Sequence, residues 1–175
     1  MNIIEIKNIY IRMKGDEVLV DVEIVPLNDF LVPRTRALIS GYLNSSSNRV
    51  DESFSSLEQL EKCEQILKRF LSYDLAHCYL AKYHQDYVGF IVLSWSISIS
   101  KGYPVLHIDG LYSSPKYRNK GIGRRLMQYA IDLANEKKAS RLQLETDDDN
   151  TPARALYTNL GFNKIPGKGV YMSFL

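Results

Sequence analysis

Arg118-Asn119-Lys120-Gly121-Ile122-Gly123 joins a strand-like run to the clearest amphipathic pattern of this 175-residue chain. Residues 105–112, before it, have the composition typical of a β-strand. Residues 121–137, after it, carry apolar side chains at helical spacing: Ile122, Leu126, Ala130, Leu133 and Ala134. The hexapeptide is therefore expected to be a strand-to-helix turn at the centre of an α/β (α+β) fold.

The residue types of this turn favour an anionic ligand. Gly121 and Gly123 let the backbone turn sharply with its N–H groups exposed, and Asn119 belongs to the few non-glycine types that tolerate positive φ. The N-terminus of the following helix adds positive potential. Basic residues dominate the surrounding segment: Lys116, Arg118, Lys120, Arg124, Arg125, Lys137, Lys138 and Arg141, against Asp132 and Glu136. The turn is suited to a pyrophosphate, although a glycine-started helix with solvated basic residues is the simpler interpretation.

The hexapeptide is neither of two common phosphate-binding motifs. A Walker A loop ends in Gly-Lys-Ser/Thr, and a dinucleotide fingerprint needs a third glycine where Leu126 stands. Nucleotide hydrolysis and hydride transfer are therefore disfavoured.

A second motif follows at residues 150–162, after a strand expected at 141–146. Its sequence is Asn-Thr-Pro-Ala-Arg-Ala-Leu-Tyr-Thr-Asn-Leu-Gly-Phe. Thr151 is suited to cap a helix, Pro152 to stand at its first position, and Gly161 to end it at the C′ position.

Together, the strand, the turn with its helix, the second strand and the N-x-x-A-x-x-L-Y-x-x-x-G-F helix resemble the GNAT superfamily of acyl-CoA N-acyltransferases. The specific match covers Asp109 to Phe162. The resemblance implies a single domain over residues 1–175, with a mixed, mostly antiparallel central sheet splayed in its middle and flanked by helices. It places an acetyl-CoA-binding core at about residues 103–162 and an acceptor-framing part at about residues 26–75.

The resemblance also assigns binding residues for acetyl-CoA. The backbone of Leu111, Tyr112 and Ser113 is expected to pair with the pantetheine arm. The pyrophosphate is expected on the amides of Arg118, Asn119, Lys120, Gly121, Ile122, Gly123 and Arg124. Asn150 matches an asparagine that contacts the pantetheine, and Ala153 allows close approach. Asn119 replaces a usual glycine and Ser113 a usual β-branched residue, but neither change removes a side chain that the chemistry needs.

Three residues are candidates for proton transfer. Tyr157 matches the tyrosine beside the thioester sulfur, and a phenol is protonated at neutral pH and can protonate a thiolate. A tyrosine on this helix face is otherwise a core residue. Asp109 and His107 lie two positions apart in the 105–112 strand, on one face by alternation, and either is a candidate base. Otherwise the carboxylate satisfies local backbone donors and the histidine is buried and neutral.

The rest of the chain is expected to form a strand over Val18 to Val25, a helix over Asp29 to Leu43 and an amphipathic helix from Ser56 to Leu71. A hairpin of Ala76 to Tyr83 and Tyr87 to Ser98, and a last strand over Gly169 to Phe174, complete the pattern. Asn44 to Ser56 is rich in Ser and Asn and is expected to be a mobile connection.

Composition narrows the classes of function. With 45% hydrophobic residues, 22 Lys+Arg and 20 Asp+Glu, the chain is an ordinary globular protein with a net charge of +2. Cys63 and Cys78 lack metal-site or disulfide spacing and are expected to be reduced and buried. Residues 1–13 lack the uninterrupted apolar core of a signal peptide, and the longest uncharged stretch, Tyr87 to Ser100, is too short to span a bilayer. A cytoplasmic protein with no membrane span is expected.

The leading hypothesis is an enzyme that transfers acetyl from acetyl-CoA directly to a primary amine of a small molecule, such as a polyamine, an aminoglycoside or an amino-acid-like compound. No metal, covalent enzyme intermediate or nucleic-acid partner is expected, and the resemblance allows a homodimer. The alternatives are a protein lysine or N-terminal acetyltransferase, a catalytically silent acyl-CoA-binding sensor and, more weakly, a nucleic-acid-binding domain using residues 116–125. Acidic residues within 51–64 favour a cationic acceptor or simply form a solvated face.

Overall fold

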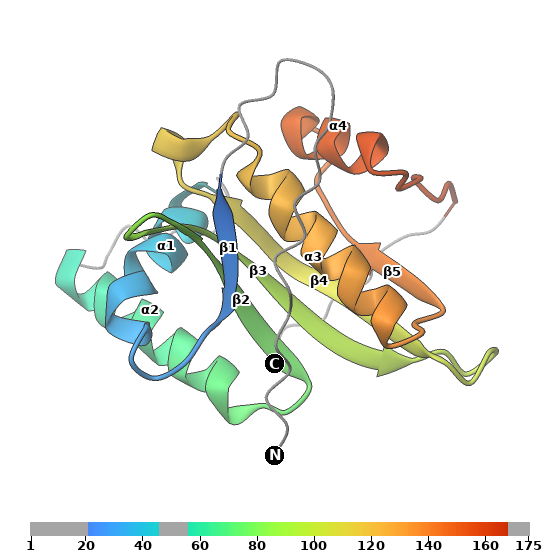
Figure 1. Cartoon of the computed structure of the whole chain (residues 1–175), viewed down its shortest axis with the longest axis horizontal. Coiled ribbons are helices and arrows are strands. Elements are labelled where there is room, and N and C mark those ends of the chain that lie inside the picture. The colour runs from blue at the N-terminus through green and yellow to red at the C-terminus, as the bar shows by residue number, and fades with distance from the viewer. Residues whose placement is uncertain (1–20, 46–55, 168–175) are drawn as a thin grey trace.

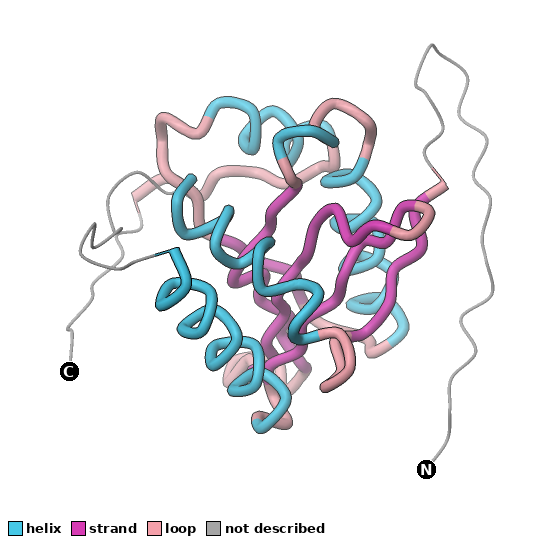
Figure 2. The backbone as a smooth tube through the Cα atoms, turned by 90° about the vertical axis from the view of Figure 1, so that its left-hand side faces the viewer, coloured by secondary structure: helices cyan, strands magenta, loops and turns pink. Residues whose placement is uncertain are grey.

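The computed structural model describes residues 21–45 and 56–167, in which five strands form one sheet with helices on both sides (Figures 1 and 2). The strands are β1 (Val22–Pro26), β2 (Ala76–Tyr83), β3 (Asp86–Ile97), β4 (Pro104–Ser113) and β5 (Arg141–Leu144). The α-helices are α1 (Val32–Ser45), α2 (Ser56–Ser72), α3 (Ile122–Glu136) and α4 (Thr151–Asn159), and a 3₁₀ helix, η1, spans Pro115–Tyr117.

The sheet is mixed and mostly antiparallel, as expected. Its strand order is β1-β2-β3-β4-β5, with antiparallel pairing from β1 to β4 and parallel pairing of β4 with β5 across α3. The parallel pairing ends at Ile108 opposite Leu144, although β4 continues to Ser113. The second half of β4 therefore has no neighbour on the β5 side in the described part of the chain, which confirms the splayed sheet.

A β-bulge lies in β4 at the point where the two strands separate. Val92 of β3 pairs with Gly110 and Leu93 pairs with Ile108, so Asp109 is an extra residue in β4. A bulge bends its strand and redirects the side chains around it. The sheet is thus bent and open at the same residue.

Each face of the sheet carries its own hydrophobic core. On one face, α3 and α4 pack on the α3-side core, which includes Leu93, Leu106 and Leu126. On the other, α1 and α2 pack on the α1-side core, which includes Leu67 and Phe90. Figure 1 shows α3 lying along β4 and β5, with α4 beyond its N-terminal end. The opening between β4 and β5 is therefore bordered by helices of both layers.

The sequence located most described elements closely. The predicted helices 29–43 and 56–71 are α1 and α2, and Asn44, Ser45 and Ser56 belong to these helices and not to the predicted connection. The hairpin turn is shorter than expected, because Asp86 already belongs to β3 and His84 adopts a φ of 54°. Residues 18–20, the rest of that connection and the strand predicted over 169–174 lie outside the described residues. None of the described helices is both long and apolar enough to cross a membrane.

Candidate functional site

The open edge of β4 is the first part of the site. Ser114 N donates to Val88 O at 2.9 Å, which fixes the backbone groups that face β3. Successive residues of a strand direct these groups to opposite edges. Leu111 and Ser113 therefore direct their N–H and C=O groups to the open edge, whereas the backbone of Tyr112 faces β3. Of the three predicted residues, only these two offer backbone pairing to a ligand.

The turn after β4 is held against the β2–β3 hairpin. Tyr117, in η1, donates from its hydroxyl to Asp86 at 2.7 Å. The Nζ atoms of Lys116 and Lys120 each lie 5.2 Å from the centre of the Tyr117 ring, within range of a cation–π interaction. Sequence reasoning missed this anchor, although Pro115 at the start of a short turn was a signal for it.

The predicted positive φ values occur in this turn. Asn119 has a φ of 58°, and Gly121, the N-cap of α3, has a φ of 79°. The first backbone bond of the helix runs from Arg125 N to Gly121 O at 2.9 Å. The amides of residues 122–124 therefore have no backbone partner in the described ranges and point out of the helix end, where an anion binds best.

Three residues of this turn and of the first turn of α3 carry positively charged side chains. Arg118, Lys120 and Arg124 form no ion pair with any carboxylate of the described residues. Gly123 has a different role from Gly121, because a Cβ there would stand 3.2 Å from Leu156 Cδ2. Its small size lets α4 pack closely on the first turn of α3.

The N-terminus of α4 is capped differently from the prediction. Asn150 is the N-cap, and its Oδ1 accepts from Ala153 N at 3.4 Å. Thr151 was the predicted cap, but it already lies inside the helix, and its hydroxyl donates to Asp149 O at 3.3 Å. Asn150 is thus oriented by the helix that it starts.

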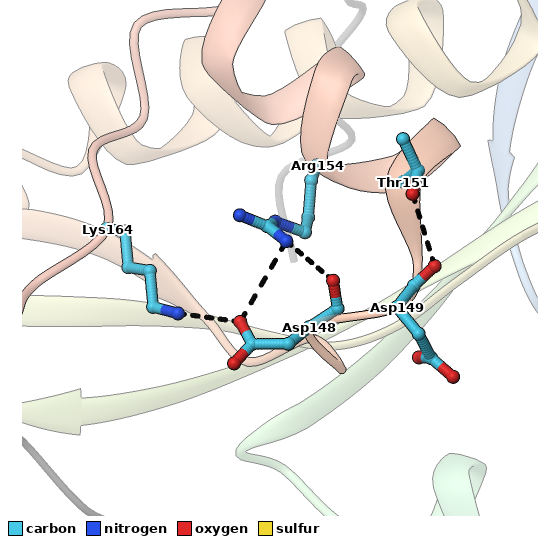
Figure 3. A network of polar contacts seen from close by, with 5 residues as sticks. All are labelled: Asp148, Asp149, Thr151, Arg154 and Lys164. Carbon is cyan, nitrogen blue, oxygen red and sulfur yellow. Dashed lines mark hydrogen bonds and ion pairs between the residues drawn. The ribbon is translucent and has the colours of Figure 1, made fainter.

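Ionic contacts tie the β5–α4 loop to the segment after α4 (Figure 3). Asp148 Oδ1 lies 2.6 Å from Lys164 Nζ, and Arg154 Nη1 donates to the Asp148 carbonyl. The hydrogen bond and charge of Lys164 lower the pKa of Asp148. These contacts connect the loop before α4 to the segment after it.

Tyr157 projects from α4 and is half-buried against the α3-side core. Its ring centre lies 6.2 Å from that of Phe162, whose N–H donates to Tyr157 O at 3.0 Å. Burial raises the pKa of Tyr157, and the neighbouring Tyr42 raises it further. The phenol therefore stays protonated, as a proton donor requires.

The bulge at Asp109 interrupts the alternation of β4. With regular alternation, Ile108 and Tyr112 would share a face, but Ile108 lies in the α3-side core and Tyr112 in the α1-side core. Leu111 packs on the same side as Ile108. The extra residue thus shifts the alternation by one position at Asp109. Alternation alone therefore does not give the face of Asp109, and its sharing of one face with His107 stays a prediction.

His107 is held within the sheet surface. Its Nε2 lies 2.8 Å from Ser96 Oγ of the neighbouring β3. The bond holds the His107 ring against β3. His107 itself lies in the part of β4 that still pairs with β5, one residue before the two strands separate.

Glu145 was missed by sequence reasoning. It directly follows Leu144 in β5, just as Asp109 follows Ile108 in β4, and Ile108 and Leu144 are the last pair between these strands. The two strands therefore each present an exposed carboxylate where they separate. Neither carboxylate forms an ion pair within residues 21–45 and 56–167. The sequence feature that could have identified Glu145 is its place near the end of the strand predicted over residues 141–146.

Comparison with known proteins gives one family match. The model of the Acetyltransferase (GNAT) family matches residues 44–162, which is more than half of the chain.

Two curated relatives are similar to this chain. Streptothricin acetyltransferase of Streptomyces lavendulae is 39% identical over 77 residues, covering 44% of this chain but only 39% of that protein. The N-acetyltransferase YhfO of Bacillus subtilis (strain 168) is 28% identical over 120 residues, covering 69% of this chain and 80% of its own length.

Among solved structures, an aminoglycoside N-acetyltransferase in complex with CoA has a TM-score of 0.69 to this chain at 16% identity. The superposition covers 88% of this chain and 95% of that one. At this level of identity the likeness shows the fold alone.

Proposed function

Because the chain belongs to the GNAT acetyltransferase family, we propose that it transfers the acetyl group of acetyl-CoA directly to a primary amine of a small molecule. The observation that carries this proposal is the alignment of two binding features. The open backbone edge of Leu111 and Ser113, where the Ser113 carbonyl accepts from Arg118 Nε at 3.4 Å, leads to the exposed amides of residues 122–124. The first suits the amides of a pantetheine arm and the second its pyrophosphate.

The chain's own residues fit acetyl-CoA along this path. The pyrophosphate lies at the α3 N-terminus among Arg118, Lys120 and Arg124, which form no ion pair in the described part of the chain. The pantetheine extends β4 on its open side, beside Asn150 at the start of α4. Its sulfur then lies at the inner end of the opening, beside Tyr157. Residues 103–162 form this binding core, and residues 26–75 frame the acceptor.

Once the amine is neutral, the reaction needs two proton movements. The amine nitrogen bonds to the thioester carbon, the carbon–sulfur bond breaks, and the sulfur leaves with the bonding electron pair. Tyr157, whose pKa is raised by burial, donates a proton to that sulfur. The proton lost by the amine goes to Asp109 or Glu145, directly or through water. The position of Asp109 at the opening favours it over His107, which bonds to Ser96.

Exposed carboxylates favour a cationic acceptor. Asp109 and Glu145 border the opening on its two strands, and neither is neutralised by an ion pair in residues 21–45 and 56–167. A protonated amine is attracted to such a site and is deprotonated there before it attacks. The relatives named for streptothricin and aminoglycosides support a small-molecule acceptor.

The test is a free-thiol release assay with purified protein, acetyl-CoA and a panel of amines. The panel contains polyamines, aminoglycosides, amino acids, lysine peptides and peptides with a free N-terminus, and a calorimetric titration with acetyl-CoA precedes it. We expect micromolar binding and turnover with a small-molecule class. Turnover only with peptides would replace the small-molecule proposal by a protein acetyltransferase. Binding without any turnover would favour an acyl-CoA sensor, and no binding would overturn the acyl-CoA site.

A further inference from the structure

Tyr42 of α1 stands over the backbone of β4 at the opening. A Cβ on Gly110 would lie 3.9 Å from Tyr42 Cζ, so the phenol end of this ring reaches Gly110. Phe90 and Tyr112 hold the ring edge-on, with centroid separations of 5.6 Å and 6.3 Å. Phe90 is 1% exposed and Tyr112 is 7% exposed. Tyr42 is thus supported by well-buried rings.

The helix that carries Tyr42 is itself held close to the sheet. Gly41 precedes Tyr42, and the Tyr112 hydroxyl occupies the space that a Cβ on Gly41 would need. Close packing of this kind leaves little room for α1 to move away from β4. The Tyr42 ring is therefore a fixed wall on the α1 side of the opening.

Tyr157 belongs to the other layer of the fold. Tyr42 packs in the α1-side core and Tyr157 on the α3-side core. Burial raises the pKa of Tyr157, and Tyr42 raises it further. Of these two rings, Tyr42 is the one that reaches Gly110.

The direction in which acetyl-CoA lies along β4 determines which part of it Tyr42 would contact. In the proposed function, acetyl-CoA runs from the turn after β4 back along Ser113 and Leu111, and its sulfur lies beside Tyr157. The acyl group extends one step further, towards Gly110, where the Tyr42 ring stands. We infer that Tyr42 closes the acyl pocket and limits the donor to short acyl groups, an inference that rests on the proposed function.

The test is calorimetric titration of CoA, acetyl-CoA and butyryl-CoA, which requires no knowledge of the acceptor. We expect the wild type to bind butyryl-CoA at least tenfold more weakly than acetyl-CoA. In Tyr42→Ala, butyryl-CoA should gain about 15-fold relative to acetyl-CoA, because each buried methylene contributes about fourfold in affinity. Tyr42→Phe keeps the ring and should keep the discrimination of the wild type.

The three ligands separate the failure of this inference from that of the proposed function. If CoA itself does not bind the wild type, the proposed function fails. If CoA binds but the butyryl-to-acetyl affinity ratio is the same in wild type and Tyr42→Ala, the acyl-pocket role fails. Should Tyr42→Ala not fold, Tyr42→Leu provides a smaller apolar wall and should improve propionyl-CoA binding relative to acetyl-CoA. An unchanged ratio in that variant would also overturn the inference.

Discussion

Tyr42 of α1 and Tyr157 of α4 pack on opposite layers of the fold, yet Tyr42 contributes to the raised pKa of Tyr157. A continuous sheet separates its two faces, whereas this sheet has a break. The break has two components, the end of pairing after Ile108 and Leu144 and the bulge at Asp109. In the proposed function, the reacting group lies at this break, between the two layers.

Replacing Tyr157 by phenylalanine removes the proposed proton donor without removing the ring. We expect Tyr157→Phe to lower kcat about 100-fold, since general acid catalysis contributes roughly 10²–10⁴. The Kd for acetyl-CoA should change less than twofold, because the phosphate turn and the β4 edge are untouched. Steady-state kinetics and calorimetry measure the two quantities. An equal loss of both would show that the hydroxyl is structural.

Gly121→Val tests the phosphate turn. Gly121 has a φ of 79°, a conformation that costs a β-branched residue about 1–2 kcal/mol. A Cβ there would meet no atom of the described residues within 4 Å, so the variant should fold and its side chain should project into solvent or ligand space. We expect the Kd for CoA to rise at least tenfold in calorimetry.

Gly102→Val is the matched control for that variant. Gly102 also has a positive φ, 68°, and no atom within 4 Å of a Cβ among residues 21–45 and 56–167, but it lies in the β3–β4 hairpin. Its substitution should lower thermal stability as much as Gly121→Val while leaving the Kd for CoA unchanged. If both variants weaken CoA binding equally, the effect is general destabilisation and the phosphate turn is misassigned.

Asp109→Asn and Glu145→Gln compare the two carboxylates at the opening. Substitution of the true proton acceptor should lower kcat/KM for a cationic amine by at least 100-fold. Substitution of a residue that only attracts the substrate should lower it about tenfold. Asp147→Asn removes an exposed carboxylate two residues beyond Glu145 and serves as the charge control. Rescue of the slow variant at higher pH, where more amine is deprotonated, would identify the base. If all three variants behave alike, neither carboxylate has a specific role.

Local features of the core motif were predictable from sequence. The positive φ at Asn119, the helix start at Gly121 and the helix end at Gly161 depend on neighbouring residues alone. The predicted N-cap, Thr151, lies one residue after the observed N-cap, Asn150, in the same Asn-Thr-Pro segment.

Features that depend on distant segments were not predictable. The bulge at Asp109 exists only relative to the register of β3, and so the faces of β4 could not be derived from alternation. Glu145 gained significance only from where β5 leaves β4. Tyr42 lies in a helix without a diagnostic motif, and its place at Gly110 follows from the packing of α1 on the sheet.

The buried thiol of Cys78 makes stability sensitive to alkaline pH. Burial raises the pKa of Cys78 from 9.0 to about 12, and its side chain lies in the α1-side core. Below pH 9 the thiol is protonated in the folded and the unfolded chain, so its full contribution to stability is present. Between pH 9 and 12 only the unfolded chain loses this proton, and the free energy of unfolding falls as pH rises.

Cys78→Ala isolates that effect. Between pH 9 and 10 the wild type should lose about 1 kcal/mol more than the variant in urea denaturation, close to the 1.4 kcal/mol per pH unit that one titrating group contributes. Val92→Ala is the control, because Val92 pairs with Cys78 across β2 and β3 and shares its core but does not ionise. It should lower stability at every pH and leave the alkaline slope of the wild type unchanged. A slope in Cys78→Ala as steep as that of Val92→Ala would show that Cys78 titrates normally and is not protected by the α1-side core.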